Sequence, residues 1–301
     1  MLKTVSGDVE FLQKLNSSKF TGSVHSTFNR TFNIKCHQNG ELYTIACRNV
    51  DNGPNTLIID VDNIRPMEIA VNDQVFTKKN ILHIGNKLAI SFESVNKWAC
   101  VVPGYPLNEE ILNQNLKKLK KFIDIHGKSG GIKKHELPNS LFEAKMSSML
   151  ELRTNLLLDE LAEDRMSSAL EHAISIIGLG PGLTPSGDDF LVGLFTSFSM
   201  LNGPFYGRRS FCEDVVSKAK TLTNDISWMA LQKASTGKVR ESIILLLNAL
   251  LGENEADLFL SLNKVLNIGS SSGTDIALGL VGGLEANIKA GGKVYVSTSI
   301  D

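Results

Sequence analysis

The chain has 301 residues, of which 42% are hydrophobic and 21% are charged, and its formal net charge is −1. This composition is typical of a globular protein with a sizeable core, and the near-neutral charge gives no support for binding nucleic acid or an anionic membrane. The N-terminus has no apolar segment typical of a secretory signal, and the longest apolar run, residues 243–251, is far shorter than the ~20 residues of a membrane span. We therefore expect a cytoplasmic protein.

The four cysteines predict packing rather than chemistry. Cys36, Cys47, Cys100 and Cys212 show no C-x-x-C spacing, so we expect reduced thiols instead of a disulfide framework or a metal cluster. The sequence also lacks the P-loop, G-x-S-x-G and H-E-x-x-H motifs. A functional site therefore has to be inferred from other patterns.

The first third of the chain has the pattern of short β-strands. Segments rich in β-branched and aromatic residues alternate with turn signals such as Asp-Asn-Gly-Pro at residues 51–54, which predicts an antiparallel sheet or a small barrel. The motif Pro-Gly-Tyr-Pro at residues 103–106 then interrupts the pattern and indicates a domain boundary. We expect strands at residues 20–28, 32–36, 42–47, 56–61, 81–84, 87–92 and 98–102, in a β-rich domain that spans residues 1–105.

Helical periodicity replaces the strand pattern from residue 108 onward. Apolar residues recur at helical spacing from Ile111 to Ile123, with lysines between them. A mobile loop is predicted at residues 125–138, where His126 and His135 are expected to be solvated. The predicted architecture is α+β, with a barrel-like antiparallel N-terminal part followed by a mainly α-helical domain over residues 106–301. We expect further helices at residues 141–153, 156–177, 188–201, 211–234, 239–250, 255–266 and 274–290, and a final strand at residues 293–298.

Two stretches of the helical part echo each other. The sequence Ser-Gly-Asp-Asp-Phe-Leu-Val-Gly-Leu at residues 186–194 returns as Ser-Gly-Thr-Asp-Ile-Ala-Leu-Gly-Leu at residues 272–280, and each copy follows a Gly/Ser-rich segment. Both copies open helices that are apolar nearly all round, which predicts that both helices are buried. Gly193 and Gly279 would let two backbones approach closely. We infer a quasi-symmetric helix pair whose N-termini lie near one another.

Each helix start has two interpretations. Ser186 with Asp189, and Ser272 with Asp275, fit the spacing of a capping box, which is a purely structural feature. Alternatively, the unpaired N–H groups of a buried helix start bind a ligand. Because carboxylates lie beside these N–H groups, a ligand with both an oxyanion and NH₂ donors fits better than a bare phosphate. A phosphate bridged by Mg²⁺ fits equally well.

The candidate site takes its residues from both helix starts and the segments before them. Carboxylates would hold NH₂ groups or a divalent cation, whereas backbone N–H groups and hydroxyls would hold an oxyanion. Asn224 opens a third helix and could face the same cavity, although an ordinary N-cap explains it as well. The candidate catalytic residues are Asp188, Asp189 and Asp275; the candidate substrate-binding residues are Gly180, Pro181, Gly182, Thr184, Ser186, Gly187, Asn224, Ser271, Ser272 and Gly273; and the possible charge partners are Arg208, Arg209, Lys233, Lys238 and Arg240.

These motifs resemble those of a known bacterial family. The stretch Gly-Leu-Gly-Pro-Gly-Leu-Thr-Pro-Ser-Gly-Asp-Asp at residues 178–189, together with Gly-Ser-Ser-Ser-Gly-Thr-Asp at residues 269–275, looks like the family that contains AllH. The turn Asn-Gly-Pro-Asn at residues 52–55 and the helix at residues 226–237 are compatible with this family as well. The resemblance therefore spans most of the chain.

The resemblance implies a subunit of the oxamate carbamoyltransferase of anaerobic allantoin degradation, a route of purine nitrogen catabolism. The implied partners are an FdrA-like and an AllG-like subunit, and the enzyme exchanges a carbamoyl group between oxalurate and phosphate, giving oxamate and carbamoyl phosphate. The residues themselves leave two alternatives: an independent Mg-dependent enzyme that binds phosphate or a nucleotide, and a non-catalytic scaffold whose glycines only permit tight packing. A cavity with no room for a small molecule would favour the scaffold.

Overall fold

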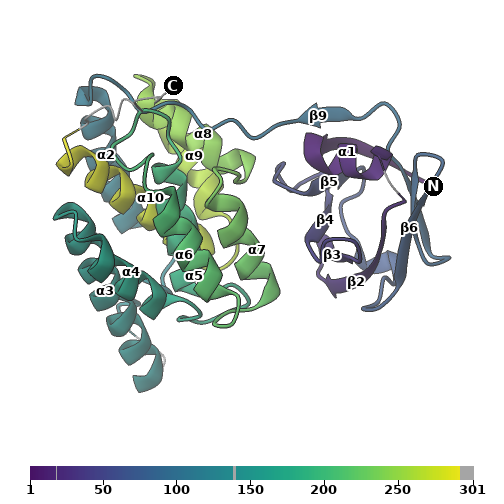
Figure 1. Ribbon diagram of the computed structural model, residues 1–301, viewed down its shortest axis with the longest axis horizontal. Helices are drawn as coiled ribbons and strands as arrows, with labels where there is room; N and C mark the ends of the chain where they lie inside the picture. Colours follow the sequence, from purple (N-terminus) through teal and green to yellow (C-terminus); the bar gives the residue numbers. More distant parts are fainter. Residues whose placement is uncertain (18, 138–139, 292–301) are drawn as a thin grey trace, which may run out of the picture. The chain divides into compact units, whose positions relative to one another are not determined.

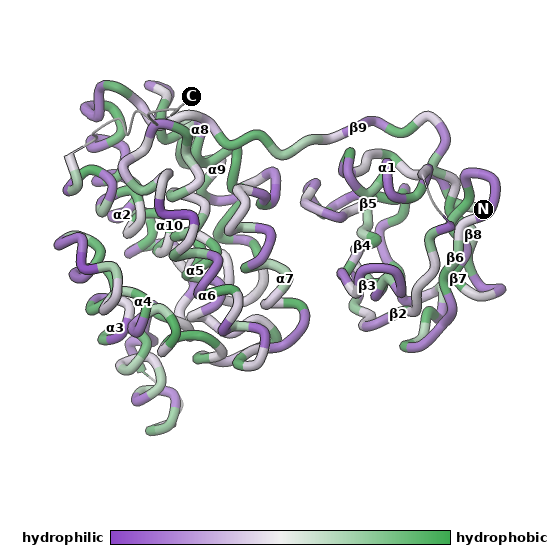
Figure 2. Tube along the Cα trace, in the orientation of Figure 1, coloured by the Kyte–Doolittle hydropathy of each residue, from purple (hydrophilic) through white to green (hydrophobic). Residues whose placement is uncertain are grey.

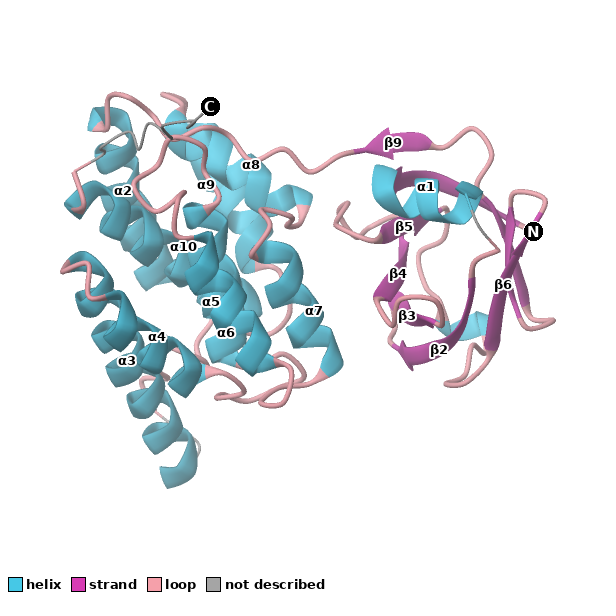
Figure 3. Cartoon of the chain, viewed as in Figure 1, coloured by secondary structure: helices cyan, strands magenta, loops and turns pink. Residues whose placement is uncertain are grey.

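The computed structural model describes residues 1–17, 19–137 and 140–291. The chain divides between Cys100 and Val101 into two compact units (Figure 1). The first unit is built mainly from strands and the second from helices (Figure 3), which confirms the predicted α+β class. Hydrophobic and hydrophilic segments alternate along the elements of each unit (Figure 2), as expected when each element has a buried and an exposed side.

The first unit is a closed β-barrel. Within its described residues, eight strands follow each other around the barrel in the order β5-β4-β3-β2-β6-β7-β8-β1, and β1 pairs with β5 to close it. The ninth strand, β9, extends the row beside β1. The strands are β1 (Leu2–Asp8), β2 (Thr21–Thr27), β3 (Thr31–Cys36), β4 (Leu42–Cys47), β5 (Thr56–Ile59), β6 (Gln74–Lys78), β7 (Ile81–Ile84), β8 (Leu88–Ser91) and β9 (Asn96–Trp98).

The barrel is mixed, whereas the sequence pattern suggested antiparallel pairing. β4 pairs with β5 in parallel, and β1 pairs in parallel with both β8 and β9. A register shift between Thr4 and Ser6 divides β1, so that its first residues pair with β8 and its last residues with β9. The chain must return to its own first strand to close the barrel, and that long-range pairing fixes the strand directions. Turn signals predict only the antiparallel pairing of strands that follow each other in the sequence, so they could not predict these parallel pairs.

Two strands and one helix of this unit were not predicted. β1 and β6 carry mostly polar, half-exposed residues, so their strand pattern is weak. Helix α1 (Val9–Ser17) contributes Phe11 to the barrel core, where its ring lies 5.8 Å from that of Phe20 and 4.5 Å from that of Tyr43. Trp98 ends β9, so the strand predicted at residues 98–102 is wrong for most of its length.

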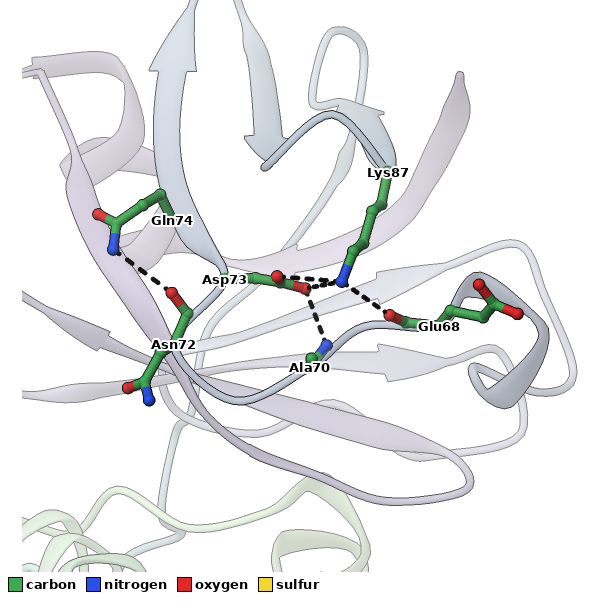
Figure 4. A network of polar contacts seen from close by, with 6 residues as sticks. All are labelled: Glu68, Ala70, Asn72, Asp73, Gln74 and Lys87. Atoms are coloured by element: carbon green, nitrogen blue, oxygen red, sulfur yellow. Dashed lines mark hydrogen bonds and ion pairs between the residues drawn. The ribbon is translucent and has the colours of Figure 1, made fainter.

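A polar network ties one loop of the barrel to β8 (Figure 4). The ammonium group of Lys87 donates to both carboxylate oxygens of Asp73, at 3.0 and 2.8 Å, and to the carbonyl of Glu68 at 3.0 Å. Asp73 also accepts from the N–H of Ala70 at 2.8 Å. These bonds, with that from Lys87 as the largest cause, lower the pKa of Asp73. They fix the segment that follows the short 3-10 helix η1 (Arg65–Met67).

The second unit is a helical bundle, as predicted. Its helices are α2 (Glu110–His126), α3 (Leu141–Ala162), α4 (Met166–Ile176), α5 (Ser186–Phe198), α6 (Arg209–Ala219), α7 (Asp225–Ala234), α8 (Glu241–Leu251), α9 (Glu255–Leu266) and α10 (Ser272–Lys289). Among the described residues, no helix is both long enough and apolar enough to cross a membrane.

Two predicted helix boundaries are wrong. The single helix expected at residues 211–234 is divided into α6 and α7, because Asn224 adopts an extended backbone and its side chain accepts hydrogen bonds from the N–H groups of Ile226 and Ser227. The break expected near residue 154 instead lies at residues 163–165, where Asp164 has a φ of 55°. The strand predicted at residues 293–298 lies outside the described residues.

Candidate functional site

Helices α5 and α10 lie side by side (Figure 1) and cross with their backbones in contact. A Cβ atom on Gly193 would collide with the carbonyl oxygen of Ile276, and one on Gly279 would collide with that of Phe190. In each case the glycine of one helix lies against the carbonyl of the residue four positions after the first serine of the other helix. This reciprocal arrangement confirms the predicted quasi-symmetric pair, and it requires glycine because any side chain would force the helices apart.

The glycine that follows each first serine has the same structural role. A Cβ atom on Gly187 would collide with the carbonyl of Ile176, at the end of α4, and one on Gly273 would collide with the carbonyl of Val265 in α9. The backbone N–H of Gly187 donates to the carbonyl of Leu179, and that of Gly273 donates to the carbonyl of Ile268. These two N–H groups are therefore already used within the protein, so their predicted role in holding an oxyanion is not supported by the geometry.

The predicted capping boxes do not form. The N-cap of α5 is Pro185 and that of α10 is Ser271, and neither side chain caps its helix. Ser186 and Ser272 lie one position further in, at the first residue of each helix. The hydroxyl of Ser272 instead lies 3.0 Å from that of Thr184, and the hydroxyl of Ser186 lies beside the carboxylate of Asp275.

Asp189 is buried at the junction of the two helix starts, with 7% of its surface exposed. Its Oδ2 accepts from the hydroxyl of Thr184 at 3.0 Å, and the same hydroxyl lies 3.0 Å from that of Ser272, at the start of the other helix. Burial raises the pKa of Asp189 to about 7. Hydrogen bonds from Ser272 and Thr184 oppose this rise, and the carboxylate of Asp275 adds to it.

Asp275, in the first turn of α10, is fully buried. Its Oδ1 accepts from the backbone N–H of Ile132 at 2.9 Å. Burial raises the pKa of Asp275 to about 6, and the N–H of Ile132 and the nearby hydroxyls of Ser186 and Ser271 oppose the rise. Oγ of Ser186 is buried beside this carboxylate, and in the described part of the chain no group donates a hydrogen bond to it.

The carboxylate of Asp188 has different hydrogen-bond partners from those of Asp189 and Asp275. Its Oδ1 accepts from the N–H of Gly178 at 2.8 Å, and its Oδ2 accepts from the hydroxyl of Thr223. Both carboxylate oxygens are thus used to fix two loops, and burial raises the pKa of Asp188. We therefore assign Asp188 to the framework and keep Asp189 and Asp275 as the acid pair.

The segment after α2 covers the acid pair, although the sequence suggested a mobile loop. The backbone N–H of Lys128 donates to the hydroxyl of Thr274 at 2.8 Å, and the ammonium of Lys133 donates to the carbonyls of Ile123, Asp124 and Gly127 at the C-terminus of α2. We call residues 127–135 the cover segment.

His126, the last residue of α2, is exposed as expected, and its ring lies against that of Phe122, with centroids 4.2 Å apart. His135, at the end of the cover segment, pairs with Glu143 of α3 at 3.1 Å.

A pocket of about 490 Å³ opens beside the cover segment and the two helix starts. Ser129, Gly130 and His135 line it from the cover segment, and Phe142, Glu143, Met146 and Ser147 line it from α3; Gly180, Pro181, Ser270 and Ser271 come from the segments before α5 and α10. This volume is within the range of small-molecule sites. Ser271 also lies near Asp275, and Gly180 packs against Ser186, so the pocket adjoins the acid pair.

The other predicted residues have different positions. Gly182 is exposed, and Asn224 caps α7 while its amide donates to the carbonyl of Leu183 at 2.8 Å. Of the possible charge partners, Arg208 pairs with Asp164 and Arg209 pairs with Glu213 on the surface.

Sequence reasoning missed Gly131 and Ile132 of the cover segment, which lie against Asp275. A paired Gly-Gly in a loop was the available signal for a close backbone approach.

The described hydrogen-bond partners of the acid pair are hydroxyl groups and one backbone N–H. Across the described ranges, no three His, Cys, Asp or Glu side chains gather in the way that metal ligands do. The arrangement offers carboxylate and hydroxyl oxygens, which accept hydrogen bonds from N–H donors.

Two protein-family models match this chain. Residues 3–97 match the AllH family N-terminal domain, and residues 176–284 match the oxamate carbamoyltransferase subunit AllH. No solved structure matches the chain. The first matched range contains the strands of the barrel up to β9, and the second contains both helix starts with the acid pair. Together the two ranges cover about two thirds of the chain.

Proposed function

The chain belongs to the AllH family, and from this premise we propose that it acts as a subunit of a carbamoyltransferase complex in allantoin and purine nitrogen catabolism. The reaction would exchange a carbamoyl group between oxalurate and phosphate, giving oxamate and carbamoyl phosphate. The partners would be an FdrA-like and an AllG-like subunit. The observation that carries the proposal is the match over residues 176–284, because this range contains the buried acid pair.

The acid pair and the adjoining pocket would bind the small substrate. Oxamate and oxalurate each carry a carboxylate and amide N–H donors, so they need both kinds of partner. Asp189 and Asp275 would accept from the N–H groups, in surroundings where burial strengthens each hydrogen bond. The carboxylate end would lie in the pocket that adjoins the acid pair, near Gly180 and Ser270.

A scaffold role is the second candidate, since packing alone accounts for Gly187, Gly193, Gly273 and Gly279. Packing does not account for two carboxylates buried beside each other, which raise each other's free energy unless a proton or a hydrogen-bond donor compensates. The pocket of about 490 Å³ also leaves room for a small molecule. We therefore favour a substrate-binding subunit.

Reconstitution of the complex tests the proposal. The chain is mixed with its FdrA-like and AllG-like partners, and carbamoyl phosphate formation from oxalurate and phosphate is measured. We expect Asp275→Asn and Asp189→Asn to reduce transfer by about tenfold or more, because each replaces a charged acceptor by a neutral amide. Arg209→Gln, which removes a surface ion pair, is the control. Unchanged transfer in both aspartate variants would exclude the acid pair from the site.

A further inference from the structure

We propose that Asp275 and Ser186 bind a primary amide group of the ligand, and that the Gly131–Ile132 peptide of the cover segment occupies that place until the ligand displaces it. The inference rests on the proposed function for the identity of the ligand. It adds which end of the ligand meets the acid pair and which part of the protein competes with it.

The first observation is that the cover segment donates fewer hydrogen bonds than the oxygens of Asp275 and Ser186 can accept. The peptide N–H of Ile132 donates to Oδ1 of Asp275 at 2.9 Å. A secondary amide has only this one N–H. The hydroxyl of Ser186, at 1% exposure, lies beside this carboxylate and can donate to it, but among the described residues no group donates a hydrogen bond to its Oγ. A primary amide brings two N–H donors and can satisfy two of these oxygens at once. The acceptors therefore suit a primary amide better than the peptide that they now hold.

The second observation is how closely the cover segment approaches. A Cβ atom on Gly131 would lie 2.5 Å from Oδ1 of Asp275 and 2.6 Å from Oγ of Ser186, and still closer to Oδ2 of Asp275. The backbone of Gly131 thus fills the space that all three oxygens face. A ligand amide and the Gly131–Ile132 peptide exclude each other.

The cover segment is held at its ends and lies free of regular structure between them. Lys128 bonds to Thr274 at one end, and Lys133 bonds to the last carbonyls of α2 at the other. Between these anchors, the contacts of Gly131 and Ile132 with the acid pair are the ones that a ligand replaces. Ser129 and Gly130 of the same segment line the pocket, so a ligand in the pocket lies directly beside the peptide that it displaces.

Charge decides which end of the ligand enters. Asp189 and Asp275 both face the junction, and the described contacts of their carboxylates are with hydroxyl and backbone N–H groups. A carboxylate or phosphate placed there meets like charge in a buried environment, which is strongly unfavourable. An uncharged amide meets acceptors only.

Oxamate and oxalate provide a matched pair of ligands, because they have nearly the same shape and only oxamate has an NH₂ group. Binding to the full chain is measured by calorimetry, and exchange of the Ile132 amide hydrogen is followed by NMR. We expect oxamate to bind about tenfold more tightly than oxalate, and saturating oxamate to speed exchange of the Ile132 amide by about tenfold as its bond to Asp275 is lost. Equal binding of the two ligands, or an Ile132 amide that stays equally protected, overturns the proposal.

Gly131→Ala gives the more distinctive result. The added methyl group prevents the cover segment from closing on Asp275, so the competing peptide is removed and oxamate should bind more tightly, by up to about tenfold. Gly207→Ala is the matched control, because a Cβ atom there has nothing within 4 Å. Weaker or unchanged oxamate binding in Gly131→Ala, relative to the control, contradicts displacement of the cover segment.

Ser186→Ala tests the second acceptor. Within the part of the chain that the structure describes, no group donates to its Oγ, so we expect the variant to fold and to lose oxamate affinity by about fivefold while oxalate affinity is unchanged. An equal loss for both ligands argues against an amide at this position. None of these measurements uses carbamoyl transfer. An inactive reconstituted complex with intact preference for oxamate would refute the proposed function alone, and loss of that preference in an active complex would refute this inference alone.

Discussion

The starts of α5 and α10 are built on the same backbone plan but place their acidic side chains in different surroundings. Both starts use a glycine against the end of the preceding helix and a second glycine at the crossing point. At α5, Asp189 accepts from the hydroxyl of Thr184, which belongs to the segment just before its own helix. At α10, Asp275 accepts from the backbone of a distant cover segment and lies beside the hydroxyl of Ser186.

The difference shows that a repeated motif can determine how two helices pack without determining the hydrogen-bond partners of its acidic side chains. The repeated glycines bring two carboxylates together because they determine how closely the helices pack. What each carboxylate does depends on the non-repeated segments around it, residues 178–185 for α5 and residues 127–135 for α10. We propose that a ligand replaces a protein group at Asp275, in α10, since the peptide N–H that bonds to this carboxylate belongs to a loop.

The largest effect is expected from breaking the helix crossing itself. Gly193→Ala and Gly279→Ala should each lower the free energy of unfolding by about 3 kcal/mol, because each added methyl group collides with a backbone carbonyl that cannot move independently. Urea unfolding measures the loss, with Gly207→Ala as the control. The reciprocal geometry predicts similar losses at the two positions, and a loss at one of them only would show that the pair is not symmetric.

The second residue of the acidic motif should distinguish the two starts. Asp188→Ala leaves the N–H of Gly178 and the hydroxyl of Thr223 without their acceptor, so we expect a loss of about 2 kcal/mol in unfolding free energy. Thr274→Val, at the equivalent position of α10, removes only the acceptor for Lys128 and should have an effect of about 1 kcal/mol. Equal losses would contradict the framework role that we assign to Asp188.

The acid pair should make the protein less stable as the pH rises. Burial raises the pKa of Asp189 to about 7 and that of Asp275 to about 6, from an ordinary value of 3.8. Below pH 3.8 both states of the protein are protonated at these groups. Between pH 3.8 and about 7 the unfolded chain releases these protons first, so the unfolding free energy falls with pH.

Asparagine variants test this pH dependence. Asp189→Asn should flatten the decline and be more stable than the wild type at pH 8 by about 1 kcal/mol, because it has no charge to bury. Denaturant unfolding at a series of pH values gives the slope, with Asp257→Asn on the exposed start of α9 as the control. A decline as steep in Asp189→Asn as in the wild type would mean that Asp189 ionises normally.

The smallest effect is expected at Thr184, which joins the two starts. Its hydroxyl bonds to Asp189 and lies 3.0 Å from that of Ser272. Thr184→Val removes a donor that lowers the pKa of Asp189, so that pKa should rise further and stability should change by only about 0.5 kcal/mol. Titration followed by carboxyl NMR measures the shift, and a lower pKa in the variant would contradict the assigned hydrogen bond.

The sequence alone determined the features that depend on local pattern. Strand and helix periodicity gave the order of the two units, and the repeated serine, glycine and aspartate spacing gave the buried helix pair with its two acids. It did not give the closure of the barrel through β1, antiparallel to β5 and parallel to β8, because the partners of that strand lie about 50 to 90 residues away in the chain.

Tertiary structure alone decided how the three aspartates differ. Asp188 and Asp189 are neighbours in the sequence and equally acidic in isolation, yet one is bonded to two loops and the other is bonded to hydroxyls at both helix starts, with its pKa raised by burial and by Asp275. The position of Gly131 against Asp275 was equally invisible, because a glycine in a polar loop has no periodicity that reports its partner. The acidity and bonding of a buried group depend on atoms brought to it from distant segments, and only the folded chain specifies which atoms those are.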